Sequence, residues 1–313
     1  MSPITYFFSR LLQIIPTFLI VMVIIFLLVR ALPGDPAIAM ADAKATAEQL
    51  EQIRQRLGLN EPLWVQFLYF VRNVFTGNLG DSILLKAPVI QVILERLPAS
   101  GFLALYAVSF SLLIAGPLAF VAALNRNGWL DITVRAVFQI GLSTPVFYIG
   151  LLLLTFLAAQ LRWFPVGGYG TTFWEHMYHL LLPALTVALY TSAIIMRNLR
   201  SSIIEVVDAE YVQFARAKGL PEHLVLGRHV LRNALISTVT LLGLSIGNLM
   251  SGTLVTETVF AVPGVGRLML DAIFARDYPL IQGLTLMFTI LVSMIFLLTD
   301  MIHAWLDPRM RVK

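Results

Sequence analysis

The residue types that most often carry out chemistry are sparse in this chain, and their spacing forms no reaction centre. The sequence has no cysteine, which excludes thiol nucleophiles, disulfide bridges and cysteine-ligated metal sites. Among its five histidines, His176 and His179 lie three residues apart, but no third ligand accompanies them. The serine, histidine and aspartate residues do not follow a recognisable triad order. We therefore expect no catalytic residue, no metal site and no enzymatic activity in this chain.

Two acidic residues lie close to the ends of long apolar segments, Glu257 and Asp300. Ionisable side chains within a membrane are candidates for function, although residues at the ends of a spanning segment can instead be solvated. Glu257 is therefore a candidate for lining a path through the membrane. The alternative is a solvated side chain at the membrane surface.

The elements that must position these residues are strongly apolar. Of the 313 residues, 58% are hydrophobic and 13% are charged, whereas soluble domains have about 25% charged residues. The apolar residues gather in uncharged stretches that are long enough to cross about 30 Å of hydrocarbon as helices. The first is longer than the apolar part of a signal peptide and lacks a small-x-small cleavage site, so we expect it to be retained. The predicted transmembrane helices cover residues 11–29, 101–124, 136–161, 177–196, 233–256 and 278–299.

The spans divide the chain into tails, loops and a membrane core. With the N-terminus inside, the inner segments hold twelve lysine and arginine residues and the two short outer loops hold three. Positive residues in short loops favour the cytoplasmic side, so both termini are predicted to be cytoplasmic. The predicted parts are an N-terminal tail at 1–10, a first span at 11–30, an outer loop at 31–100, a core at 101–305 that includes a cytoplasmic loop at 200–232, and a C-terminal tail at 306–313.

The outer loop at 31–100 is too long for a simple connection, so it should have its own structure. A helix is predicted from residue 46 or 47 to residue 57, with Gly58 as its stop. Residues 62–75 have apolar side chains at helical spacing and predict a second helix. This second helix would lie on the membrane surface or pack on the bundle, or it would dock a partner or substrate. A short helix at 88–97 would lead into the second span.

The loop between the fourth and fifth spans has start and stop signals for a short helix. Asp208 can cap its N-terminus, Gly219 fits the left-handed position after its last turn, and Pro221 follows. A helix of about ten residues is marginal in isolation, so it must pack either on its own bundle or in a groove of a soluble partner. The residues predicted to couple the chain to such a partner are Glu210, Tyr211, Phe214, Ala215, Arg216, Ala217, Lys218 and Gly219.

Small residues recur four apart on the fifth span, at Gly243, Gly247 and Ser251. Such a face lets two helices approach closely. Its partner is predicted to be either another helix of this chain or a second membrane subunit.

Short motifs follow one another along the chain in a fixed order. The loop reads Ala-Arg-Ala-Lys-Gly-Leu at residues 215–220 and Leu-Arg-Asn-Ala-Leu at residues 231–235. In these motifs the chain resembles bacterial ABC importer permeases of the dipeptide, oligopeptide and nickel group, as the first of their two permease chains. It departs from the wider pattern at residues 213–215, where Gln-Phe-Ala replaces Glu-Ala-Ala, and at Asn78, where the group has Asp. Further matching motifs lie at residues 32–36, 57–63, 256–260, 263–268, 276–279 and 307–309.

The resemblance implies an all-α membrane protein with six transmembrane helices, the type I ABC importer permease fold and a structured outer loop between helices 1 and 2. It implies a permease that forms half of a pore in the bacterial cytoplasmic (inner) membrane. The implied partners are a second homologous permease subunit, two ABC ATPase subunits and an extracytoplasmic substrate-binding protein. ATP and Mg would bind to the ATPase subunits, because this chain lacks a phosphate loop, and we expect no cofactor on it.

The substrate class follows from the resemblance alone. We expect a dipeptide, an oligopeptide or glutathione, with a nickel chelate or a sugar as alternatives, and the amino group of a peptide would pass Glu257. The rival class is an ion-coupled secondary transporter, which predicts internal repeats and charged or broken helices at mid-membrane. The spans are uncharged at their centres and no repeat is evident. The basic residues form no dense stripe, so we do not expect nucleic acid as a partner.

Overall fold

The computed structural model describes residues 3–31, 46–56 and 58–306. Within these ranges the regular secondary structure is helical, apart from an isolated bridge between Asp81 and Pro88, which confirms the predicted all-α class. The motifs at 32–36 and 307–309 lie outside the described residues, as does the C-terminal tail beyond residue 306.

The helices follow one another with short connections. They are α1 (Pro3–Ala31), α3 (Ala47–Arg56), α4 (Leu63–Phe75), α5 (Val89–Leu124), α6 (Trp129–Ser143), α7 (Val146–Leu153), the π-helix η1 (Leu154–Gln160), α8 (Phe173–Val207), α9 (Glu210–Ala217), α10 (Glu222–Leu224), the π-helix η2 (Val225–Leu231), α11 (Arg232–Val259), α12 (Val265–Ala275) and α13 (Tyr278–Leu306).

The membrane spans comprise straight helices and bent pairs. By length and composition, four helices within α1, α5, α8 and α13 can cross a membrane. Two bent pairs also qualify, one of α6 with α7 and η1, and one that runs from α10 into α11. Counting each pair as one span gives up to six, the predicted number. The predicted helix at 88–97 is the first part of α5, which continues without interruption into the second span.

The third span is not the straight helix predicted over residues 136–161. Its two parts meet at an angle of 99°, with Thr144 extended (φ −93°, ψ 128°) in front of Pro145. Proline has no N–H to donate, and its ring disfavours a helical conformation in the preceding residue. The prediction of one continuous helix over residues 136–161 was wrong because it was based on hydropathy, which contains no information about the backbone conformation before a proline.

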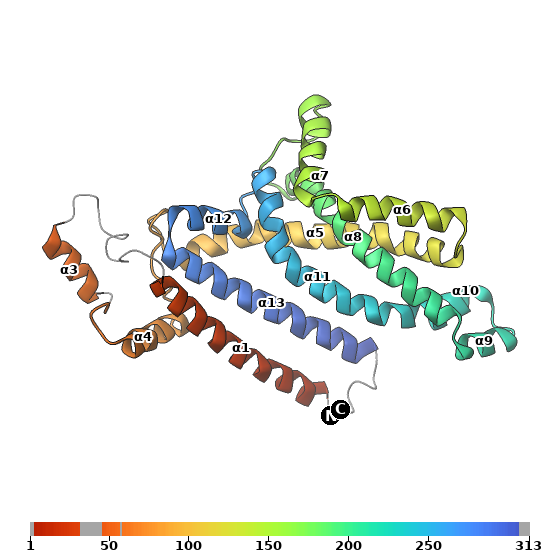
Figure 1. Cartoon of the computed structure of the whole chain (residues 1–313), viewed down its shortest axis with the longest axis horizontal. Coiled ribbons are helices and arrows are strands. Elements are labelled where there is room, and N and C mark those ends of the chain that lie inside the picture. Colours follow the sequence, from red (N-terminus) through yellow and green to blue (C-terminus); the bar gives the residue numbers. More distant parts are fainter. Residues whose placement is uncertain (1–2, 32–45, 57, 307–313) are drawn as a thin grey trace.

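The centre of the bundle is formed by α5 and α8, and α1 lies at its edge (Figure 1). In the most apolar 18-residue window of each helix, 67% of α8 is buried but only 22% of α1. Buried alanines of α5, among them Ala107, Ala115 and Ala119, let the helices approach closely. Short helices gather at the two ends of the bundle, with α3, α4 and α12 at one end and α9 and α10 at the other.

The small-residue face of the fifth span packs against α13 of the same chain. A Cβ atom at Gly243 would collide with the side chain of Thr299, and one at Gly247 would lie 3.7 Å from the ring of Phe296. Both glycines therefore face a helix of their own chain in this structure. The side chain of Ser251 lies outside the described residues.

Two ion pairs join helices of the bundle, one between α6 and α8 and one between α1 and α13. Asp131, at the start of α6, is fully buried and accepts a bidentate fork from Arg200 of α8, with an Nε–Oδ1 distance of 2.5 Å and an Nη2–Oδ2 distance of 2.6 Å. Arg10 of α1 lies 3.3 Å from the Asp300 carboxylate of α13. Asp300 is thus paired, and both bonds fix neighbouring helices at the same depth.

Replacing Arg200 by alanine should destabilise the protein strongly, because the buried Asp131 carboxylate loses its fork of donors and keeps only the Asn127 N–H at 3.0 Å and the half-exposed Arg135 at 3.3 Å. Removing one partner of such a pair costs about 3–5 kcal/mol. The matched control is Arg126→Ala, since Arg126 pairs with Asp208 at 3.2 Å while its side chain stays 56% exposed. This exposed pair should contribute about 1 kcal/mol or less. Free energies of unfolding in detergent micelles test the difference, and equal losses for the two variants would contradict it.

Candidate coupling helix, anchored loops and outer cavity

The short helix α9 follows the central helix α8 after only two residues. It begins at Glu210, and its N-cap position is Ala209, in an extended conformation (φ −69°, ψ 141°) without a side-chain cap. The prediction that Asp208 caps this helix was therefore wrong. Asp208 instead ends α8, and its carboxylate lies 3.2 Å from Arg126 in the connection before α6. The helix has eight residues, slightly fewer than the predicted ten.

The end of α9 is a Schellman motif, as the predicted position of Gly219 requires. Gly219 is left-handed (φ +77°), and its N–H donates to the Arg216 carbonyl at 2.9 Å. The Leu220 N–H donates to the Ala215 carbonyl at 3.3 Å. These are the two bonds that satisfy the last carbonyls of a helix when glycine occupies the position after the cap. The helix therefore stops sharply and the chain turns towards α10.

The two faces of α9 differ in composition and exposure. Val212 and Ala215 are buried in a cluster that also contains Val225 of η2. On the opposite face, Tyr211 is 45% exposed and Phe214 is 66% exposed. The spacing of Ala215 would place it on the same surface as Tyr211 and Phe214. Ala215 instead packs on the protein's own bundle, so it is not part of the exposed aromatic surface. The remaining predicted coupling residues are exposed: Glu210, Arg216, Ala217, Lys218 and Gly219.

Side-chain bonds hold α9 against the segment that follows it. The Arg216 guanidinium donates to the Glu222 carboxylate at 2.8 Å, and this hydrogen bond raises the pKa of Arg216 above its ordinary value. Arg216 is therefore charged at any physiological pH. The Tyr211 hydroxyl donates to the His229 carbonyl at 3.4 Å. The aromatic face is thus presented on a short, anchored helix.

Glu257 is a buried anchor for the start of α12. Its side chain is 0% exposed, and its two oxygens accept the Ser100 hydroxyl at 2.6 Å and the Arg267 N–H at 2.9 Å. The Ser100 oxygen accepts the Val265 N–H at 2.8 Å. These N–H groups belong to the first turn of α12. Backbone N–H groups in the first turn of a helix have no acceptor within that helix. This burial excludes the solvated alternative for Glu257, whereas its place on a membrane path stays a prediction.

A second anchor, Asp277, was not predicted from the sequence. It is fully buried at the N-cap of α13, where it accepts the Leu280 N–H at 3.2 Å. Its other oxygen accepts the Ser82 hydroxyl at 2.6 Å and the Leu84 N–H at 3.0 Å, which fixes the connection before α5. An aspartate two residues before a proline at the start of a helix is the signal that could have identified this cap.

The paired histidines and one catalytic-looking motif have structural explanations. A ring nitrogen of His176 lies 2.7 Å from the Tyr169 carbonyl, and one of His179 lies 2.9 Å from the Gly167 carbonyl. Among the described residues, no group of three or more histidine or acidic side chains is arranged to hold a metal ion. The letters Gly-x-Ser-x-Gly at residues 243–247 lie inside α11, whereas a nucleophile elbow requires a strand-to-helix turn.

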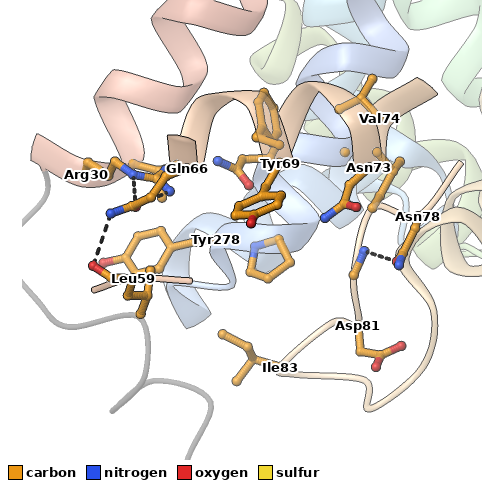
Figure 2. A pocket seen from close by; sticks show the side chains of 17 residues that line it. Arg30, Leu59, Gln66, Tyr69, Asn73, Val74, Asn78, Asp81, Ile83 and Tyr278 are labelled. Atoms are coloured by element: carbon orange, nitrogen blue, oxygen red, sulfur yellow. Dashed lines mark hydrogen bonds between the residues drawn. The ribbon is translucent and has the colours of Figure 1, made fainter. Parts of the chain in front are cut away.

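A cavity of about 380 Å³ opens at the other end of the bundle, between α1, α4, α13 and the connection after α4 (Figure 2). At one side, Arg30 donates to the Gln66 side-chain oxygen through Nε at 2.9 Å and Nη2 at 2.8 Å. Asn73 and Asn78 lie on the opposite side, and Tyr69 lies between (Figure 2). Sequence reasoning proposed a docking surface on α4 without locating this cavity, because its walls come from segments far apart in the chain.

The bundle, the broken third span and the anchored helix between two spans define a class, that of a membrane permease with a type I ABC importer fold. A chain of the MetNI methionine ABC transporter in an inward-facing conformation has this fold, with a TM-score of 0.58 and 16% identity, over 69% of this chain and 97% of that one. An amino acid ABC transporter has it as well, with a TM-score of 0.53 and 12% identity, over 68% of this chain and 93% of that one. At these identities the likeness concerns the fold alone.

Sequence comparison identifies the family. Residues 115–312 match the model for binding-protein-dependent transport system inner membrane components, and residues 4–105 match the model for the N-terminal part of such components. The chain belongs to this family, and it is a multi-pass inner membrane permease of an ABC importer. The glutathione transport system permease protein GsiC of Pectobacterium atrosepticum is 42% identical over 99% of this chain and its own full length. A Brucella abortus protein whose name assigns it to a peptide transport system is 40% identical over 97% of this chain and 98% of its own.

Replacing Glu257 by alanine should loosen the start of α12 and lower stability. Each buried donor that loses its acceptor costs about 1–3 kcal/mol, and both the Ser100 hydroxyl and the Arg267 N–H lose theirs. The matched control is Asp271→Ala, since Asp271 is on α12, the helix whose start Glu257 anchors, and its side chain is 53% exposed. Thermal unfolding followed by size-exclusion fluorescence should show a clear fall for Glu257→Ala and little change for the control. An unchanged midpoint for Glu257→Ala would show that the anchor is unimportant.

Proposed function

We propose that this chain forms half of the translocation pore of an ATP-driven importer for glutathione and short peptides. The support for the substrate class is the pair of relatives, at 42% and 40% identity, whose names refer to glutathione and peptide transport. Dipeptides and longer peptides remain within the proposed range. A nickel chelate or a sugar is the alternative that a substrate screen must address.

The proposed partners follow from the family. A second homologous permease completes the pore, two ABC ATPase subunits bind and hydrolyse ATP with Mg, and an extracytoplasmic binding protein delivers the substrate. Both termini and α9 face the cytoplasm in this proposal, in line with the excess of lysine and arginine in those segments. No cofactor is assigned to this chain. Membership of the binding-protein-dependent family decides against the rival ion-coupled secondary transporter.

The observation that carries the coupling role is the exposed aromatic face of α9. Phe214 is 66% exposed in the middle of α9, whose other face is buried, so it is available to a groove in an ATPase subunit. Aromatic anchors that fill a partner's pocket commonly dominate the energy of an interface. The proposed coupling set keeps the exposed residues Glu210, Tyr211, Phe214, Arg216, Ala217, Lys218 and Gly219. Ala215 lies on the buried side of α9 and packs the helix against the bundle.

The function is tested by purification and reconstitution. A tagged chain extracted from its native membrane should emerge with a second permease and ATPase subunits. Proteoliposomes of that complex, supplied with its binding protein, should take up labelled glutathione only when ATP is present on the cytoplasmic side. Dipeptides, a nickel–histidine chelate and a disaccharide serve as competing substrates. Uptake by this chain alone without ATP would overturn the proposal, and preferential uptake of the chelate or sugar would overturn the substrate assignment.

Replacing Gly219 by valine should uncouple ATP hydrolysis from substrate delivery without unfolding the spans. A left-handed conformation costs a residue with a Cβ atom about 1–2 kcal/mol, and a β-branched residue is especially unfavourable there. A Cβ atom at Gly219 would meet no atom within 4 Å, so the effect arises from the backbone alone. The matched control is Gly219→Asn, because asparagine tolerates this conformation. The measurement is substrate-stimulated ATPase activity in liposomes, and wild-type stimulation in Gly219→Val would defeat the prediction.

A further inference from the structure

We propose that the cavity between α1, α4 and α13, called here the outer cavity, binds the terminal carboxylate of a short peptide, and that Arg30 is the residue that binds this carboxylate. The proposal deepens the proposed function and rests on it, because it takes the imported peptide as the ligand of this cavity. It assigns a substrate contact to the permease at the outer end of α1, before the peptide enters the pore.

Arg30 keeps a pair of donors free for a carboxylate. A guanidinium has five N–H groups, of which Nε and one N–H of Nη2 donate to Gln66, and one of Nη1 reaches the Phe26 carbonyl at 3.5 Å. The two remaining N–H groups, one on each terminal nitrogen, lie parallel at the end of the plane. This is the fork that binds a carboxylate through two hydrogen bonds. Among the described residues, no carboxylate forms an ion pair with Arg30.

Gln66 and Phe26 hold the guanidinium in place before a ligand arrives. The Gln66 side-chain nitrogen donates to the Glu61 carbonyl at 2.7 Å and the Leu59 carbonyl at 3.1 Å, so its oxygen must face Arg30. The Phe26 ring centre lies 3.6 Å from the guanidinium carbon, a cation–π contact that fixes the plane. Gln66 is thus a positioning residue for Arg30. Such preorganisation favours binding, because little rotamer freedom remains to be lost.

The rest of the cavity matches a peptide bond. The side chains of Asn73 and Gln282 line it without a hydrogen-bond partner among the described residues, as does the Tyr69 hydroxyl (Figure 2). A carboxamide offers one donor group and one acceptor, which is the complement of a peptide amide. Apolar side chains such as Val74 and Leu79 also line the cavity, and Asp81 places a carboxylate in its wall on the side away from Arg30 (Figure 2). The volume of about 380 Å³ is within the range of about 300–1,000 Å³ that small-ligand sites occupy.

A phospholipid phosphate is the other oxyanion that Arg30 could meet at a membrane surface. A phosphate accepts hydrogen bonds and offers none, so it would leave the carboxamide oxygens of Asn73 and Gln282 without a donor. The amide-lined wall therefore favours the peptide, and lipid occupancy is an outcome of the test.

The test measures the binding of glutathione to the purified complex of this chain with its partners, in nanodiscs and without the binding protein. Arg30→Gln should weaken binding about 10- to 100-fold, the loss typical of hydrogen bonds to a charged group. The matched control is Arg72→Gln, which removes an exposed arginine of α4 that does not line the cavity and should bind as wild type does. Arg30→Lys keeps the charge without the fork and should fall between wild type and Arg30→Gln.

Comparison with the monoethyl ester of glutathione, which masks only the terminal glycine carboxylate, separates recognition from damage. The wild-type complex should prefer the free acid to the ester, and Arg30→Gln should bind the two alike, whereas a merely structural lesion would weaken both equally. Gln66→Ala should reduce the same preference in part. Equal preference for the free acid in wild type and Arg30→Gln would overturn the proposal. So would a phospholipid, seen by native mass spectrometry, that is lost in Arg30→Gln and not displaced by glutathione.

Failure of this site is distinguishable from failure of the proposed function. If the wild-type system imports glutathione with ATP but the Arg30 variants bind it as wild type does, only the cavity assignment is wrong. If the wild-type system imports neither glutathione nor peptides, the proposed function itself is wrong.

Discussion

A carboxylate removed from water must find hydrogen-bond donors inside the protein, and this requirement fixes the ends of three helices here. Asp131, Glu257 and Asp277 are each fully buried. Each lies at or beside the start of a helix, where backbone N–H groups lack intrahelical partners. Glu257 and Asp277 accept such N–H groups from α12 and α13, and Asp131 binds Arg200 of α8 and the Asn127 N–H. The depth and direction of neighbouring helices follow from these bonds, since apolar packing alone allows two helices to slide.

The position of α9, the proposed coupling helix, depends on the same helix bundle. It is short, and its buried face contributes only two side chains, Val212 and Ala215. Its position is therefore set by its two connections, the two residues that follow α8 and the turn at Gly219 that leads into η2 and α11. Both connections are tied, at Asp208 to Arg126 and at Arg216 to Glu222. In the proposed importer, a displacement of α9 by an ATPase subunit reaches α8 and α11 together.

The sequence predicted most of the architecture because hydropathy and end signals are local properties. The uncharged stretches located the spans, and the left-handed turn at Gly219 followed from residue types within one turn of a helix. What it could not predict depends on contacts between distant segments. Glu257 could not be placed without Ser100, which is 157 residues away, and the outer cavity joins Arg30 to Gln66 and α13. The bend at Pro145 was within reach, because the restriction it imposes on Thr144 is local.

The Glu257 anchor also limits how the sequence can change. A Cβ atom at Gly264 would overlap the Glu257 carboxylate and the Ser100 hydroxyl, and one at Gly266 would lie 2.9 Å from a Glu257 oxygen. The motif at 256–260, the glycines at 264 and 266, and Ser100 on a different helix therefore depend on one another. In divergent relatives Glu257, Gly264, Gly266 and Ser100 should be exchanged together or retained together. A chimaera that takes α12 and its preceding loop from another permease must also take residue 100 of α5.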